Sequence, residues 1–128
     1  MGTDARTWPG GKRWAYSVTY DEGCELLLTH ALPLHRRYGI PGHVALLASQ
    51  IGVPRNVPGS SYDGMPILSR PQIEGLCREG WGVSCHGMTH NFIAPEATRF
   101  ELLESREMLE KALDVPITLF CLPGDNSH

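Results

Sequence analysis

The chain has 128 residues, of which 41% are hydrophobic and 20% charged, and its formal net charge is −3. This composition is typical of one globular domain with its own core, and it excludes a disordered or fibrous chain. No basic run is longer than Arg36-Arg37, which argues against a nucleic-acid or anionic-membrane partner, because phosphates are neutralised by clustered Lys and Arg.

The N-terminus, residues 1–13, is rich in Gly, Pro and charge, so we expect a flexible arm there and a single domain over residues 14–128. No stretch reaches the roughly 18 apolar residues of a membrane span, and no signal peptide is visible. The four cysteines form no C-x-x-C pair and are expected to be reduced. These features predict a cytoplasmic protein, although a secreted chain whose leader has been removed would look the same.

Aromatic and β-branched residues at 14–20 predict a first strand, which ends at Asp21-Glu22-Gly23. A helix is expected to follow over residues 24–38, and Pro33 should kink it or split it in two. One face of this helix is predicted to carry Leu27, Ala31, Leu34 and Tyr38.

The apolar run at 43–48 predicts a second strand, and the many Gly and Pro residues at 49–69 predict a long irregular loop. Ser69 is a candidate N-cap with Gln72 three positions later, which predicts a helix over residues 70–79.

A third strand is predicted at 81–85, a longer helix at 95–113 and a fourth strand at 117–121. Strands that alternate with helices indicate an α/β fold with parallel strands and right-handed crossovers. Ligands of such folds bind at the carboxyl ends of the strands. Asp21-Glu22, His86 and the Pro123-Gly124 turn all follow predicted strand ends, so we expect them on one rim of the sheet.

His86 and His90 stand four positions apart, a spacing that lets two imidazoles share one metal ion. Alternatively, they are ordinary loop histidines.

The adjacent carboxylates Asp21 and Glu22 allow one group to bind a metal while the other acts as a base. Alternatively, they are solvated acids at a helix N-terminus. Two histidines and one carboxylate suit a divalent ion, zinc first, with cobalt, nickel, manganese and iron as alternatives.

Together these segments resemble the polysaccharide deacetylase (NodB-homology) family. Its pattern opens with a strand ending in T-F-D-D-G, continues with L-x-x-x-G-x-E-I-x-S before H-(S/T)-x-x-H, and later has F-x-x-P-(Y)-G-D. The matching segments here are Thr19-Tyr20-Asp21-Glu22-Gly23, Leu76 to His86, His86 to His90, Glu104 to Leu113, and Phe120 to Asp125. The match covers residues 14–128 in order and corresponds to the first half to two thirds of that domain.

The resemblance implies a partial or distorted (β/α) barrel and a metal-dependent hydrolase that removes an N- or O-acetyl group from a carbohydrate. It implies Asp21 as the catalytic base and Glu22, His86 and His90 as the metal ligands. Near the substrate we expect Pro123 and Gly124, whose backbone can assist the oxyanion, and Tyr62 of the long loop as a sugar contact.

Three positions depart from the family pattern. The ligand position is Glu22 where Asp is usual, so Asp21 and Glu22 could exchange roles. Cys121 stands where many relatives carry an Arg that orients the base. The late His that acts as general acid in relatives has no counterpart before the chain stops at His128, so we expect the C-terminal part of the domain to be absent. His128 or a partner chain would then supply the acid.

Two other functions remain open at this stage. Relatives of the same fold that open cyclic ureides or imides often show an E-E-G or D-E-G turn like Asp21-Glu22-Gly23, although the presence of both His86 and His90 argues against this branch. The second open function is that of a truncated, non-catalytic domain, which binds a glycan or assembles with a partner. An open sheet edge would favour a homo-oligomer.

Overall fold

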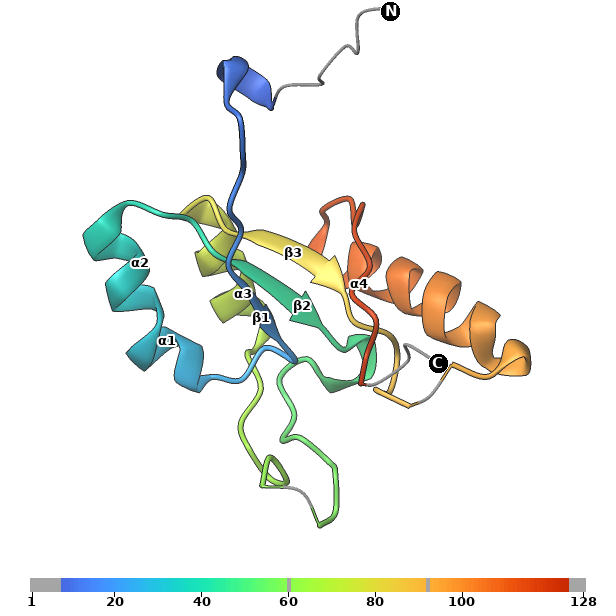
Figure 1. Cartoon of the computed structure of the whole chain (residues 1–128). Coiled ribbons are helices and arrows are strands. Elements are labelled where there is room, and N and C mark those ends of the chain that lie inside the picture. The colour runs from blue at the N-terminus through green and yellow to red at the C-terminus, as the bar shows by residue number, and fades with distance from the viewer. Residues whose placement is uncertain (1–7, 60, 92, 125–128) are drawn as a thin grey trace, which may run out of the picture.

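The structure, a computed structural model, describes residues 8–59, 61–91 and 93–124. Its sheet has three parallel strands in the order β1-β2-β3 (Figure 1). They are β1 (Thr19–Asp21), β2 (His43–Leu46) and β3 (Gly82–Cys85). In register, Ala45 of the central strand pairs with Asp21 on one side and Ser84 on the other. The expected α/β fold with parallel strands is therefore confirmed, as an open sheet.

The α-helices are α1 (Leu26–His30), α2 (Leu32–Tyr38), α3 (Arg70–Arg78) and α4 (Ser105–Leu113). Short 3₁₀ turns occur at Pro9–Gly11, Ala48–Gln50 and Pro95–Ala97, and a π-helical turn at Arg99–Glu104 leads into α4. Within the described parts of the chain, no helix is both long and apolar enough to cross a bilayer. All four cysteines are free thiols.

The centre of the core is β2 and the residue after it. Val44, Ala45, Leu46 and Leu47 are at most 1% exposed, as expected for a central parallel strand with both faces covered. Around this strand pack residues from α3, α4 and the segments next to them, including Leu68, Ile73, Leu76, Leu109 and Ile117. The core thus holds the carboxyl ends of the strands in fixed positions.

The first helix is split, as Pro33 predicted. Pro33 stands in the first turn of α2, where its missing N–H costs no hydrogen bond. The predicted apolar face was wrong in its second half, because Leu34 and Tyr38 are exposed while Leu32 and His35 are buried. The helix restarts at Leu32, so the spacing of a single continuous helix does not carry across the break.

Two predicted strands are shorter than expected. Residues 14–18 lie outside β1, and residues 117–121 make only one parallel bridge, between Cys85 and Phe120. A strand is defined by its neighbour, and in the described residues the backbone hydrogen bonds of this segment to the sheet are those with Cys85, which accepts from the N–H of Cys121 and donates to Leu119. The expected fourth strand is thus reduced to an isolated bridge.

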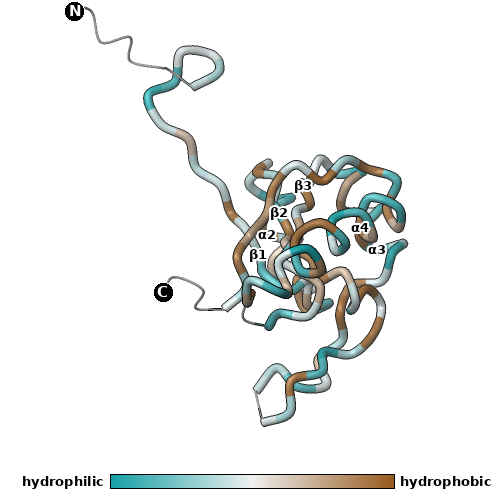
Figure 2. The backbone as a smooth tube through the Cα atoms, turned by 90° about the vertical axis from the view of Figure 1, so that its right-hand side faces the viewer, coloured by the Kyte–Doolittle hydropathy of each residue, from teal (hydrophilic) through white to brown (hydrophobic). Residues whose placement is uncertain are grey.

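The predicted helix at 95–113 was also wrong in its first half, where the chain forms the 3₁₀ and π-helical turns. Figures 1 and 2 show that the N-terminal segment and the loop between β2 and α3 project from the sheet in opposite directions. Within the described part of the N-terminal arm, Trp8 and Lys12 form a small backbone bridge.

Candidate metal centre

The turn after β1 presents two carboxylates at the rim of the sheet. Glu22 and Gly23 both adopt left-handed backbone angles, with φ of 67° and 73°, and the Gly23 N–H donates to Asp21 O at 2.8 Å. A Cβ on Gly23 would lie 2.8 Å from the Leu46 side chain, so glycine alone fits here. The tight turn therefore places Asp21 and Glu22 side by side where the sheet ends.

His86 follows β3 directly and is 1% exposed. Its N–H donates to Leu46 O at 2.8 Å, and its Nδ1 lies 3.0 Å from the carbonyl oxygen of Cys121. A carbonyl can only accept, so Nδ1 carries a proton, and in the neutral ring Nε2 is then the atom that can bind a metal. This is the arrangement that orients a metal-binding imidazole.

His90 closes the histidine pair from a strained backbone position, with φ of 69°. Its ring centroid lies 5.0 Å from that of His86, and its Nε2 lies 3.4 Å from Oε1 of Glu22. Burial lowers the pKa of His90, while the charge of Glu22 acts in the opposite direction. The neutral imidazole that results is the form that binds metals. His90 thus lies beside both Glu22 and His86, but among the described residues only Asp21, His86 and Cys121 have ligand atoms that all lie within 4.8 Å of one another.

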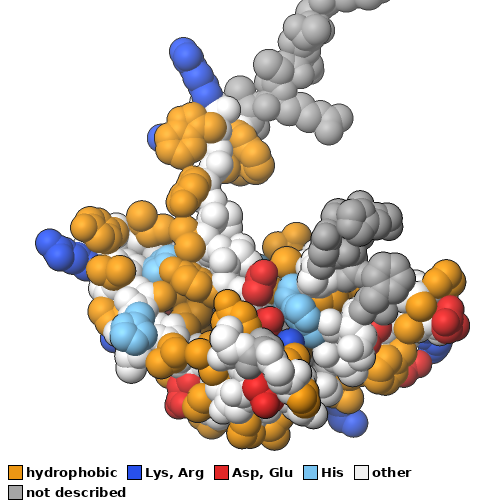
Figure 3. Space-filling view, turned by 60° about the horizontal axis from the view of Figure 1, so that its bottom comes forward, with side chains coloured by type: hydrophobic (Ala, Val, Ile, Leu, Met, Phe, Trp, Pro, Cys, Tyr) orange, Lys and Arg blue, Asp and Glu red, His pale blue; other side chains and the backbone are white. Residues whose placement is uncertain are grey.

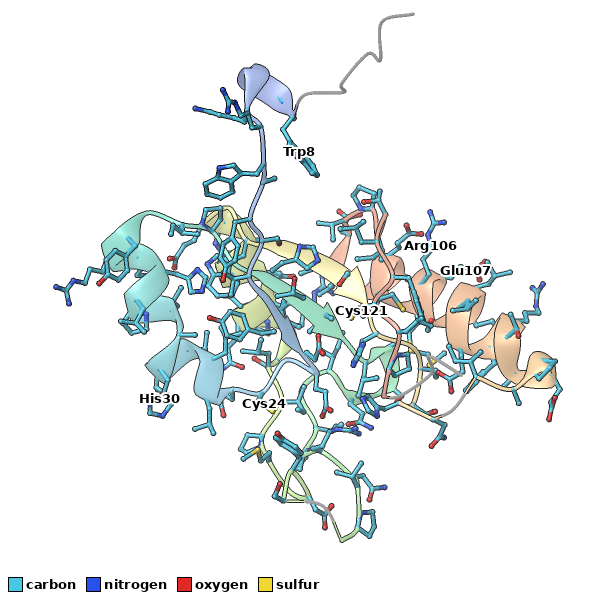
Figure 4. All side chains as sticks on the ribbon, in the orientation of Figure 1. Trp8, Cys24, His30, Arg106, Glu107 and Cys121 are labelled. Atoms are coloured by element: carbon cyan, nitrogen blue, oxygen red, sulfur yellow. The ribbon has the colours of Figure 1, made fainter. Side chains whose placement is uncertain are left out.

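Asp21 lies close to His86 and Cys121. A ligand atom from each of Asp21, His86 and Cys121 falls within 4.8 Å of the others. The Cys121 thiol donates to Asp21 Oδ1 at 3.7 Å, and burial and the Asp21 carboxylate raise the pKa of that thiol. Figure 4 labels Cys121 on the segment that returns from α4 to the strand ends. A thiol with a raised pKa thus contacts the Asp21 carboxylate.

The donors fit a divalent ion. Two imidazoles and two carboxylates lie at the strand ends, and the view of Figure 3 shows histidine and acidic side chains side by side between hydrophobic flanks. Nitrogen and oxygen donors of this kind suit zinc, cobalt and iron. Glu22 is the more enclosed carboxylate, with 16% of its side chain exposed, whereas Asp21 is exposed to solvent.

The sequence analysis missed two residues of the site. Arg55, from the loop between β2 and α3, is 2% exposed and forms an ion pair with Glu22. No local sequence pattern predicts this contact, because the two residues are 33 positions apart.

Glu101 is the second missed residue, and it is also 2% exposed. It accepts hydrogen bonds from the backbone of Met88 (2.6 Å) and Thr89 (3.2 Å) and from the Thr89 hydroxyl (2.5 Å). These bonds fix the loop between the two histidines. A signal was present, since Glu101 shares the four-residue spacing of the buried Ser105 and Leu109.

The predicted substrate-side residues take different positions. Pro123 is buried, and a Cβ built on Gly124 would lie 3.8 Å from the His90 ring, so this turn packs against the histidine loop. Tyr62 is 53% exposed on the loop between β2 and α3. His128 lies outside the described residues.

The sequence and fold of the chain can be compared with those of known proteins. No curated protein sequence matches the chain. Among solved structures, "IcaB from Ammonifex degensii" superposes with a TM-score of 0.71 at 22% identity, covering 84% of this chain and 49% of that one. The Streptococcus pyogenes deacetylase PplD in complex with acetate gives 0.69 at 18% identity, covering 93% and 51%. A Clostridium thermocellum family 4 acetyl xylan esterase with a cobalt ion gives 0.58 at 15%, covering 84% and 47%.

At these identities the structural matches establish the fold, and the chain spans about half the length of these structures. The family itself rests on the sequence. Residues 10–127 match the family model described as polysaccharide deacetylase, and this range includes both carboxylates, both histidines and the Pro123-Gly124 turn. The chain therefore belongs to the polysaccharide deacetylase family.

Proposed function

We propose that this domain is the metal-and-base part of a hydrolase that removes an N- or O-acetyl group from a carbohydrate. The observation that carries the proposal is that His90 lies beside both Glu22 and His86 at the strand ends, with Asp21 close to His86. The family match supports the reaction class. The acetate and cobalt ion of two structural relatives are consistent with it.

The ligands would be Glu22 and the Nε2 atoms of His86 and His90. A divalent ion held there, zinc in the first place, supplies polarisation of the acetyl carbonyl and a more acidic water. Asp21 is exposed at the rim, so it can reach a water molecule and take its proton. The Pro123-Gly124 turn lies against His90 and would border the acetyl group, and Tyr62 would contact the sugar.

The direct test is acetate release from an acetylated chitooligomer by the purified chain. We expect a chelator to remove activity and His86→Ala to abolish it, because His86 supplies a ligand that no neighbour replaces. Asp21→Asn should retain the metal and lower kcat by about 10²- to 10⁴-fold, the usual contribution of a general base.

The matched control is His30→Ala, which removes an exposed histidine of α1 and should leave acetate release unchanged. Allantoin assayed in parallel separates the cyclic-ureide alternative. Turnover of allantoin alone, or acetate release that is insensitive to both the chelator and His86→Ala, would overturn the proposal.

A further inference from the structure

Glu22 presents a geometric problem that an Asp would not. Its side chain has one more methylene than the usual ligand of the family pattern, and hence one more torsion to restrain. A carboxylate that turns freely presents either oxygen, or neither, to an ion. A metal centre that uses Glu22 therefore needs a contact that fixes which oxygen of this carboxylate faces the histidines.

Arg55 contacts this carboxylate from a distant loop. Its Nε donates to Oε2 of Glu22, and its Nη1 donates to Oε1 of Gln50 at 3.1 Å. Its backbone is held as well, because its N–H donates to Met65 O and its carbonyl accepts from Gly64, both at 2.8 Å. With 2% of the side chain exposed, the guanidinium is a rigid, desolvated anchor.

The anchored carboxylate leaves its other oxygen facing His90. Oε1 of Glu22 lies 3.4 Å from Nε2 of His90. Two ligand atoms that each lie about 2.0–2.1 Å from one tetrahedral ion are about 3.3 Å apart. The pair is therefore already spaced as two ligands of one ion, while Arg55 occupies the oxygen that the ion does not need.

We propose that Arg55 is a positioning residue of the metal centre, which fixes Oε2 of Glu22 so that Oε1 is presented as a ligand. It thereby offsets the extra methylene at the ligand position. The inference rests on the proposed metal centre. The opposite reading is that the ion pair competes with the metal for Glu22, and the two readings predict opposite changes in metal affinity when the guanidinium is removed.

The test is the affinity for Zn²⁺ and Co²⁺, measured by calorimetry on the full chain. We expect R55Q to weaken binding by about 10- to 100-fold, the usual effect of losing a group that orients a ligand. R55K keeps the charge but not the planar fork, so it should fall between R55Q and the wild type. R70Q is the matched control, because Arg70 pairs with Glu74 on the exposed face of α3, and it should bind as the wild type does.

A double variant isolates the role of the extra methylene. E22D restores the shorter ligand and draws it away from Arg55, which then stands buried without its partner. In that background R55Q should no longer weaken binding, so E22D/R55Q is expected to bind at least as tightly as E22D. A merely structural Arg55 would give the same loss in both backgrounds.

Unchanged or tighter metal binding by R55Q would overturn the inference while leaving the metal centre in place. A wild-type chain that binds no divalent ion would overturn the proposed function first. Circular dichroism reports whether R55Q is folded, and if it is not, R55K carries the test, with unchanged affinity contradicting the proposal.

Discussion

At the scale of single residues, the loop between His86 and His90 is held by the buried carboxylate of Glu101. The Glu101 carboxylate accepts three hydrogen bonds from Met88 and Thr89, which lie between the two histidines. In Glu101→Gln one acceptor oxygen becomes a donor and the charge is lost, so we expect a loss of about 1.5–3 kcal/mol in the free energy of unfolding. Urea unfolding measures this loss, and weaker metal binding should accompany it.

The neighbouring acid of the same helical segment is the control for Glu101. Glu104 has 45% of its side chain exposed and faces Arg99 at 3.3 Å, so Glu104→Gln should change the stability by less than about 0.5 kcal/mol. Equal losses for the two variants would mean that the bonds to the histidine loop add nothing beyond a general effect of charge.

The residues of the centre differ in how far the sequence predicted them. Asp21, Glu22, His86 and His90 follow strand ends, and parallel strands bring such ends to one rim, so their proximity was predicted from chain order. Arg55 and Glu101 reach the same rim through the folded paths of a loop and a π-helical turn. No periodicity encodes those paths, and such contacts become visible only in the structure.

At the scale of elements, the first residue of β2 ties stability to pH. His43 lies between two strands, and its Nε2 has no hydrogen-bond partner among the described residues. Burial lowers the pKa of His43 from its ordinary value of 6.5. The unfolded chain therefore binds this proton at higher pH than the folded chain does. As pH falls below about 6.5, the free energy of unfolding should decrease.

The variant His43→Gln removes the titrating group and keeps a polar side chain of similar reach. We expect its stability to fall less steeply than that of the wild type between about pH 7 and pH 5. Urea unfolding at several pH values, with metal removed, measures both slopes. Parallel slopes would show that His43 is not the group responsible.

Some element boundaries depend on local chemistry, and others depend on distant parts of the chain. The start of α3 was predicted because Ser69 and Gln72 form a capping box, which is local chemistry. The extent of β1 and the loss of the fourth strand were not predictable, because the length of a strand depends on where its neighbour runs. The misplaced helix face around Leu34 has a local cause, the restart of the helix at Leu32, just before Pro33.

At the scale of the whole molecule, three parallel strands place Asp21, Glu22 and His86 at one edge of the sheet. The rim positions come from the core, because β2 is buried on both faces and fixes β1 and β3 in register. The chain spans about half the length of the solved structures that it matches.

The most direct measurement is anomalous diffraction at the zinc edge from crystals of the zinc-loaded chain. The account predicts one peak about 2.0–2.2 Å from Nε2 of His86, Nε2 of His90 and Oε1 of Glu22, with Arg55 on Oε2 of the same carboxylate. A peak bound instead by Asp21, His86 and Cys121, whose ligand atoms also lie close together, or no peak at this rim, would contradict it.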